Sequence, residues 1–331
     1  MKKYKICKIL LVILAIFLCV AFYELLGICV AYKKQPEVSN TTKKETKNGS
    51  WNECSENTER AVIIEKNPEA LLQRVRLIKN AKKEIILSTF AFQSDESGKL
   101  ILGALHDAAD RGVHVRILVD GMESWIDMEG NPYFYGLSSH ENVEIKLYNK
   151  ANPLKPWKTM GRMHDKYLIA DGKIYILGGR NTYNYFLGDF PGHKNFDRDV
   201  LVVCDEPQKD NSVNQLWNYF ETIWEQEDCR YFHNSKKLAD RQSVKKAVLE
   251  LQEGYQQYFE VNKEKICDTD YADETFETEK ITLLSNPIHT QAKEPVVWYQ
   301  LGELMKNAKE RVKIHTPYII CNLSLIHISE P

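Results

Sequence analysis

The stretch from Met163 to Asn181 constrains the fold of this chain more than any other. It contains two short apolar runs joined by Asp171-Gly172, a dipeptide typical of the tight turn in a β-hairpin. His164 and Lys166 stand two residues apart at the start of the first run, so on a β-strand their side chains point to the same face. The pattern predicts a strand–turn–strand unit that presents a histidine and a lysine together.

The chain on either side of this hairpin alternates between strand-like and helix-like segments. Strands are expected at residues 61–64, 84–92, 113–119 and 143–148, and helices at residues 69–81, 98–111 and 211–225. Pro68 suits the first turn of one helix, and Gly112 suits the end of another. Strand, helix and strand in close succession indicate βαβ units, so we expect an α/β fold with a largely parallel sheet.

A short internal repeat indicates a duplicated unit. Lys79-Asn80-Ala81-Lys82 recurs as Lys306-Asn307-Ala308-Lys309, and an apolar strand that reaches a threonine follows each copy, at residues 85–89 and 312–316. We interpret this as two α/β halves, the second of which begins near residue 280 and is incomplete in this chain.

His-x-Lys-x4-Asp followed by Gly-Gly-x-Asn, as it stands from His164 to Asn181, resembles the motif of the phospholipase D superfamily. Three further segments resemble parts of that family: the helix–strand junction at 108–116, the acidic segment at 196–200 and the opening of the second half at 314–318. The resemblance covers about residues 61–322 and is closest to cardiolipin synthase-like members. It implies an α/β/α sandwich with a mixed sheet and a duplicated half.

The resemblance also implies roles for the motif residues. His164 would attack a phosphodiester to give a covalent phosphohistidine. Lys166 and Asn181 would hold the phosphate oxygens and stabilise charge in the transition state, and Gly179 would let the backbone approach the same group. A second histidine, from the other half, would serve as acid and base at roughly position 391 by analogy between duplicated halves.

Three carboxylates complete the candidate site. A carboxylate on the second ring nitrogen of His164 would fix its tautomer, and Asp199 is the first choice for that role, with Asp197 as the alternative. Asp171 belongs to the motif and is included as catalytic, although an aspartate before glycine is often only a turn residue.

The N-terminus carries a membrane-anchor signal. Residues 9–32 are apolar apart from Glu24 and would span roughly 36 Å as a helix, enough to cross a bilayer. A cleaved signal peptide is the alternative, but the end of the stretch offers no small-residue cleavage site. The short basic N-terminus, residues 1–8, predicts a cytoplasmic start and an extracytoplasmic catalytic domain.

These observations divide the chain into segments. The expected divisions are 1–8 basic N-terminus, 9–32 transmembrane anchor, 33–60 flexible linker, 61–230 first half, 231–279 connection, 280–322 start of the second half, and 323–331, which resembles a translated sequencing adapter. We expect the natural protein to diverge near Asn322 and to be longer.

Composition narrows the function. Lys and Arg total 44 against 46 Asp and Glu, a net charge of −2, which argues against a protein built to coat nucleic acid. Eight scattered cysteines without a C-x-x-C pair predict neither a disulfide scaffold nor a metal site. We expect a membrane-anchored phospholipid phosphodiesterase or phosphatidyltransferase without metal or cofactor, with phospholipid and membrane as partners. A nuclease of the same superfamily and a non-catalytic lipid-binding relative are the alternatives, and the oligomeric state stays open.

Overall fold

The computed structural model describes residues 2–49, 59–207 and 209–314. Its helices are α1 Lys2–Tyr32, α2 Asn40–Asn48, α3 Asn67–Asn80, α4 Glu96–Asp110, α5 Gly121–Asp127, α6 Pro132–Ser138, α7 Ser212–Trp224, α8 Gln242–Cys267 and α9 Val296–Asn307, with 3₁₀ turns η2 Pro156–Lys158 and η3 Lys236–Leu238. Its strands are β1 Glu59–Ile64, β2 Glu84–Thr89, β3 His114–Asp120, β4 Val143–Tyr148, β5 Tyr167–Ala170, β6 Ile174–Gly178, β7 Asp199–Cys204, β8 Cys229–Tyr231 and β9 Phe276–Glu277.

The described strands form a nine-stranded mixed sheet in the order β8-β4-β3-β2-β5-β6-β7-β1-β9. The α/β class and the mixed sheet are confirmed, but the sheet is not largely parallel. Only β2 with β3 and β3 with β4 pair in parallel, whereas the other six pairings are antiparallel. A tight turn such as the one between β5 and β6 can join only antiparallel neighbours, and only β2 with β3 and β3 with β4 are directly paired strands joined through helices.

The predicted hairpin is present. Asp171 and Gly172 both have left-handed backbone conformations, with φ of 53° and 63°. The two central residues of a type I′ turn require such positive φ values. The turn pairs β5 with β6 and so fixes which strand ends lie together.

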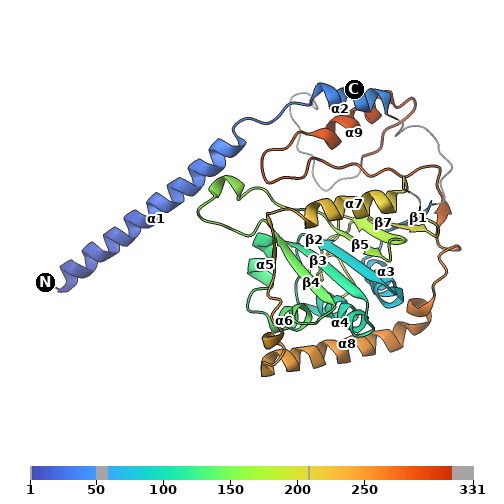
Figure 1. The fold of residues 1–331 in the computed structure, drawn as a ribbon, viewed down its shortest axis with the longest axis horizontal. Helices are drawn as coiled ribbons and strands as arrows, with labels where there is room; N and C mark the ends of the chain where they lie inside the picture. The colour runs from blue at the N-terminus through green and yellow to red at the C-terminus, as the bar shows by residue number, and fades with distance from the viewer. Residues whose placement is uncertain (1, 50–58, 208, 315–331) are drawn as a thin grey trace.

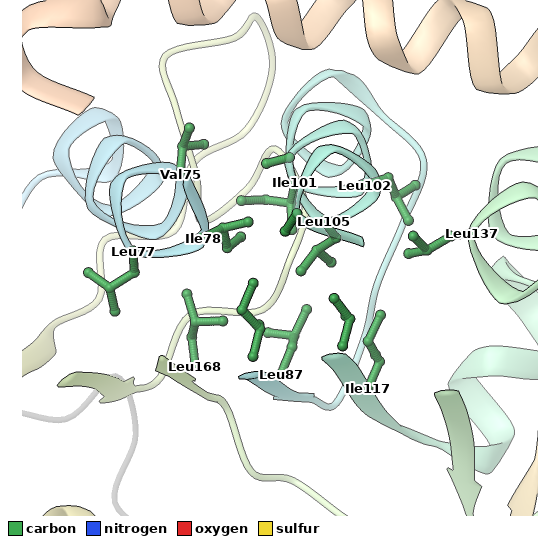
Figure 2. Packing of buried hydrophobic residues seen from close by; sticks show 14 of the residues in the cluster. Val75, Leu77, Ile78, Leu87, Ile101, Leu102, Leu105, Ile117, Leu137 and Leu168 are labelled. Atoms are coloured by element: carbon green, nitrogen blue, oxygen red, sulfur yellow. The ribbon is translucent and has the colours of Figure 1, made fainter. Parts of the chain in front are cut away.

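Helices cover both faces of the sheet (Figure 1). On one face α3 and α4 pack their apolar side chains against β2, β3 and β5, which makes the larger core (Figure 2). On the other face α7 packs Leu216, Phe220 and Trp224 against the sheet in a second cluster. Burial of both faces explains the expected α/β/α sandwich.

Helix α8 is a core element that the sequence interpretation missed, since residues 231–279 were expected only as a connection. It lies across the outer side of the helical layer (Figure 1). Its close crossing with α4 depends on Gly103, where a Cβ would meet the Leu251 carbonyl oxygen at 2.6 Å. The buried positions of α8 are Val244, Ala247, Leu251, Tyr255, Phe259 and Ile266.

The two ends of the described chain lie outside this sandwich. Helix α1 extends away from the body (Figure 1), and from Tyr4 to Tyr32 it is long and apolar enough to cross a membrane. The segment expected as a flexible linker contains α2. Helices α3 and α9 both end at the asparagine of the repeated tetrapeptide, but residues 312–314 form no strand.

Other predictions about the C-terminal end lie outside the described residues. They concern Thr316 at the end of the repeated strand, the family-like Pro317-Tyr318 and the adapter-like residues 323–331. The limits of the two halves, 61–230 and 280–322, stay predictions.

Candidate active site

The candidate site lies at the carboxyl ends of the parallel strands β2 and β3. Because β5 runs antiparallel to β2, with Ser88 opposite Tyr167, the residues before β5 meet the residues after β2. Carboxyl ends of parallel strands are the usual place for a ligand site in a sheet of this kind. The sequence therefore folds so that His164 and Lys166 reach this edge.

His164 is exposed and its ring packs on Phe90, the first residue after β2, with ring centroids 4.6 Å apart. Partial desolvation, reinforced by the Lys166 ammonium, lowers the pKa of the His164 imidazole below its ordinary value. The ring is therefore neutral at neutral pH, the form in which a histidine nitrogen can act as a nucleophile.

Lys166 contacts the backbone of the histidine. Its residue is 6% exposed, and its Nζ donates a hydrogen bond to the His164 carbonyl oxygen at 2.6 Å. Burial lowers the pKa of the Lys166 ammonium to about 8, so the group is still mostly charged at neutral pH. A poorly hydrated cation next to a nucleophile is well suited to an anionic oxygen of a phosphodiester.

Both residues line a cavity of about 370 Å³. Arg162 lies beside them, and Lys293 enters from the segment before α9. The floor holds Asp165, whose carboxylate accepts a hydrogen bond from the Tyr219 hydroxyl at 2.8 Å and whose pKa is raised by burial. Three cationic side chains around one carboxylate make this cavity suited to an anionic ligand.

Asp120, which sequence reasoning missed, holds the segment that leads to His164. It is the last residue of β3 and is 1% exposed. Its carboxylate accepts hydrogen bonds from the Arg162 guanidinium, at 2.6 Å from Nη2, and from the Met163 backbone N–H at 3.0 Å. These bonds hold the two residues that precede His164, so Asp120 positions the histidine without contacting it.

The glycine pair serves a different neighbour from the one expected. A Cβ on Gly178 would collide with Asp199, and a Cβ on Gly179 would collide with the Asp197 carboxylate. The absence of Cβ atoms therefore makes room for the start of β7 and the loop before it, whereas the sequence interpretation expected the glycines to make room for a ligand. Gly178 lines the cavity and Gly179 does not.

Asn181 also lies outside the cavity lining. It is 7% exposed, and its Oδ1 accepts a hydrogen bond from the Ala91 backbone N–H at 3.3 Å. The structure thus places Asn181 against the segment that follows β2, and contact with a phosphate through its amide stays a prediction.

The structure does not bring Asp199, the first choice as orienting carboxylate, to His164. Asp199 is 1% exposed, and its Oδ2 lies 2.9 Å from Arg74 and 3.2 Å from Arg180, both themselves buried. An ion triad of this kind stabilises the junction of α3, β6 and β7. Within the described residues, no carboxylate hydrogen-bonds the His164 ring.

Asp197, the alternative, lies nearer the site. Its carboxylate adjoins Gly179, and its charge acts on Lys166, whose pKa it raises against the effect of burial. It is the predicted carboxylate that interacts with the pair His164 and Lys166, although through the lysine and not through the histidine ring.

Asp171 lies at the far end of β5 from His164. Its carboxylate accepts hydrogen bonds from three consecutive backbone N–H groups, those of Lys82, Lys83 and Glu84, at 2.9, 2.7 and 3.0 Å. This corrects the inclusion of Asp171 among the catalytic residues, because the side chain holds the loop between α3 and β2 to the hairpin.

Among residues 2–49, 59–207 and 209–314, no group of three or more His, Cys, Asp or Glu side chains could hold a metal ion. Lys166, Arg162 and Lys293 line the same cavity as His164, whose pKa is lowered. This arrangement suits nucleophilic attack by a neutral imidazole on an anionic ester.

Known proteins resemble this chain in sequence and fold. Residues 74–224 match the family model described as the cardiolipin synthase PLD-like domain. A Helicobacter pylori (strain ATCC 700392 / 26695) protein described as an uncharacterized protein is 27% identical over 296 residues, 81% of this chain and 56% of its own. Cardiolipin synthase C of Escherichia coli (strain K12) is 30% identical over 154 residues, 42% of this chain and 31% of its own.

Among solved structures, NucT from Helicobacter pylori covers 53% of this chain and 99% of its own, with a TM-score of 0.41 and 18% identity. The chain spans 56% of the length of the first relative and 31% of the second. The family match contains the whole His-x-Lys-x4-Asp motif and strands β2 to β7, and with the cardiolipin synthase relative it supports the resemblance to the phospholipase D superfamily.

Proposed function

We propose that this protein is a membrane-anchored phosphodiesterase or phosphatidyltransferase that acts on phospholipids through a phosphohistidine. The observation that carries the proposal is the neutral, exposed His164 imidazole above the buried Lys166 ammonium, at a cavity lined by two more cations. Such an arrangement suits a phosphodiester substrate whose leaving group is an alcohol.

The proposed first step forms a bond between a His164 ring nitrogen and phosphorus. The bond from phosphorus to the leaving alcohol oxygen breaks, and that oxygen keeps the electron pair and takes a proton from an acid. Lys166 holds the non-bridging oxygens throughout. In the second step an acceptor, which is water in a hydrolase or another alcohol in a transferase, attacks the phosphohistidine and loses its proton to the same group.

The phospholipid substrate and the anchor rest on two supports. The name of the E. coli relative, Cardiolipin synthase C, supports a phospholipid head group as the substrate. Helix α1, whose span from Tyr4 to Tyr32 could cross a bilayer, would keep the cavity near those head groups and so raise their effective concentration. We propose that the catalytic body lies on the extracytoplasmic side.

The proposal is tested by trapping the intermediate. The protein is expressed from the complete reading frame, since the resemblance predicts a second motif beyond residue 322. Its reaction with phosphatidylglycerol vesicles is then quenched in alkali during turnover. We expect acid-labile phosphate on the peptide that contains His164, and none in the His164→Ala variant. His193→Ala, which changes another exposed histidine, is the matched control and should retain the label.

Two outcomes would contradict the proposal. Phosphate on a serine or an aspartate would exclude the histidine mechanism. Absence of phospholipid turnover together with salt-sensitive cleavage of DNA would replace the phospholipid substrate by nucleic acid.

A further inference from the structure

The segment from Lys150 to Met160, which leads into the active site, exposes large apolar side chains. Leu154, Trp157 and Met160 are 77%, 43% and 55% exposed. A soluble surface rarely gathers such residues within seven positions, and where it does they usually mark a contact with a protein or a membrane. We call Leu154, Trp157 and Met160 the apolar loop.

The apolar loop contacts the membrane-helix candidate α1. The Tyr23 hydroxyl donates a hydrogen bond to the Leu154 carbonyl oxygen at 3.2 Å. Pro156 packs so closely on α1 that a Cβ on Gly27 would lie 2.4 Å from its ring. In Figure 1 the loop lies where α1 leaves the body of the protein.

The length of α1 places this contact at the surface of a bilayer. The candidate span has 29 residues and rises about 43 Å, whereas the hydrocarbon core is about 30 Å thick. With the basic residues 1–8 at the opposite interface, a core of about 30 Å that begins at Ile9 ends near residue 29, so the last turns of α1, from about Gly27 onward, lie at the boundary between lipid and water. Tyrosine is a residue that favours this depth, and Glu24 then avoids the hydrocarbon centre.

A second exposed apolar group lies on helix α5. This helix begins against the start of the segment from Lys150 to Met160, because a Cβ on Gly121 would lie 2.6 Å from the Lys150 backbone. The same helix exposes Trp125 and Ile126, at 64% and 66%. Helix α5, which begins against Lys150, therefore carries further exposed apolar side chains.

The charges around the loop match an anionic surface. Lys150 and Lys155 are exposed within the segment itself, and Lys33 and Lys34 are exposed just after α1. Each lysine near an anionic leaflet contributes about 1 kcal/mol of attraction. Tryptophan and leucine flanked by lysines are the composition of segments that lie in the interface.

We propose that the apolar loop inserts into the interfacial region of an anionic bilayer beside α1. Since Met160 precedes His164 by only four residues, insertion would set the mouth of the cavity at the level of the head groups. The inference rests on the anchor in the proposed function, but it concerns a surface that makes no contact with the reacting atoms.

The test is a depth measurement on the full chain in vesicles of phosphatidylglycerol and phosphatidylcholine with brominated acyl chains. Bromine quenches tryptophan fluorescence at short range, and the difference between the wild type and Trp157→Phe isolates the Trp157 signal. We expect Trp157 to be quenched by the brominated lipid and shielded from aqueous acrylamide. Quenching by acrylamide alone would overturn the proposal, and shielding from both quenchers would replace the lipid by a protein partner and overturn it as well.

A second variant separates this inference from the proposed function. Leu154→Ser with Trp157→Ser and Met160→Ser should lower turnover of vesicle phospholipid at least tenfold, and turnover of a water-soluble phosphodiester should stay within twofold of the wild type. Leu249→Ser with Val261→Ser, at exposed positions of α8, is the matched control and should change neither. Equal loss on both substrates would overturn the surface role. Trp157 quenching by lipid in a chain that turns over no phospholipid would instead contradict the proposed function alone.

Discussion

The two ends of strand β5 carry charged residues of one sequence motif and use them differently. At the start, His164 and Lys166 face a cavity, and the lysine is nearly buried with a pKa lowered to about 8. At the far end, Asp171 binds three backbone N–H groups and faces none of that cavity. Asp171 lies five positions after Lys166, which is about 16 Å along an extended chain.

One sequence motif therefore contains both residues that line a ligand cavity and a residue that stabilises the fold. A buried cation with little hydration attracts an anionic ligand strongly, whereas a carboxylate whose oxygens already accept several hydrogen bonds has little capacity left for a ligand. Asp199 and Asp197 also differ in their partners, because Asp199 forms ion pairs with two buried arginines, whereas the Asp197 charge acts on Lys166. Variants at these positions test whether the division is real.

The largest effect is expected for His164→Ala in the complete reading frame. Removal of an attacking group should lower turnover by roughly 10⁴- to 10⁶-fold. The residue is exposed, so the urea midpoint should match that of the wild type. Phospholipid turnover within tenfold of the wild type would remove His164 from the mechanism.

The next effect is on stability and comes from Asp199→Ala. This change leaves Arg74 and Arg180 buried without their carboxylate, which costs about 3–5 kcal/mol in the free energy of unfolding. Urea denaturation followed by circular dichroism measures the loss. Asp189→Ala, at an exposed position, is the control. If Asp199→Ala kept its stability but lost turnover, the orienting role first assigned to it would be restored.

A smaller loss of stability is expected for Asp171→Asn. Asparagine tolerates the left-handed backbone found here but loses the charge that three N–H groups bind, a change of about 1–3 kcal/mol. Turnover per folded molecule should stay within threefold, and initial rates normalised to the folded fraction measure it. A loss of turnover at unchanged stability would place Asp171 back among the catalytic residues.

Much of this fold could be predicted because local signals and tertiary structure agree. Apolar periodicity located β1 to β4, α3, α4 and α7, and Asp171-Gly172 located the hairpin. Helix α8 carried a readable signal as well, because Val244, Ala247, Leu251 and Tyr255 are spaced three or four apart. Sheet direction was misjudged, since hairpins and crossovers contribute different pairings and the βαβ units were given too much weight.

The site could be predicted only in part. His164 and Lys166 follow from spacing on one strand, but the position of a carboxylate depends on which strand lies next to it. Asp120 had a signal, namely an aspartate at the carboxyl end of a parallel strand. Lys293 had none, because it reaches the cavity from a segment distant in sequence.

The smallest effect is a pH dependence that belongs to the catalytic end of β5 alone. His164 must be neutral, and its pKa lies below the ordinary value. Turnover should therefore rise with pH and should reach its plateau without a further rise centred above about 6.5. Lys166 must be charged, and its pKa is about 8, so turnover should fall above that value, at most tenfold per pH unit.

Because the Asp197 charge raises the pKa of Lys166, Asp197→Asn should move the alkaline limb to lower pH. Lys166→Arg should move the same limb beyond the measured range, since a guanidinium keeps its proton. Rates between pH 5 and 10 on a neutral-headed soluble phosphodiester measure both shifts, and an alkaline limb that neither variant moves would separate Lys166 from the bound phosphate.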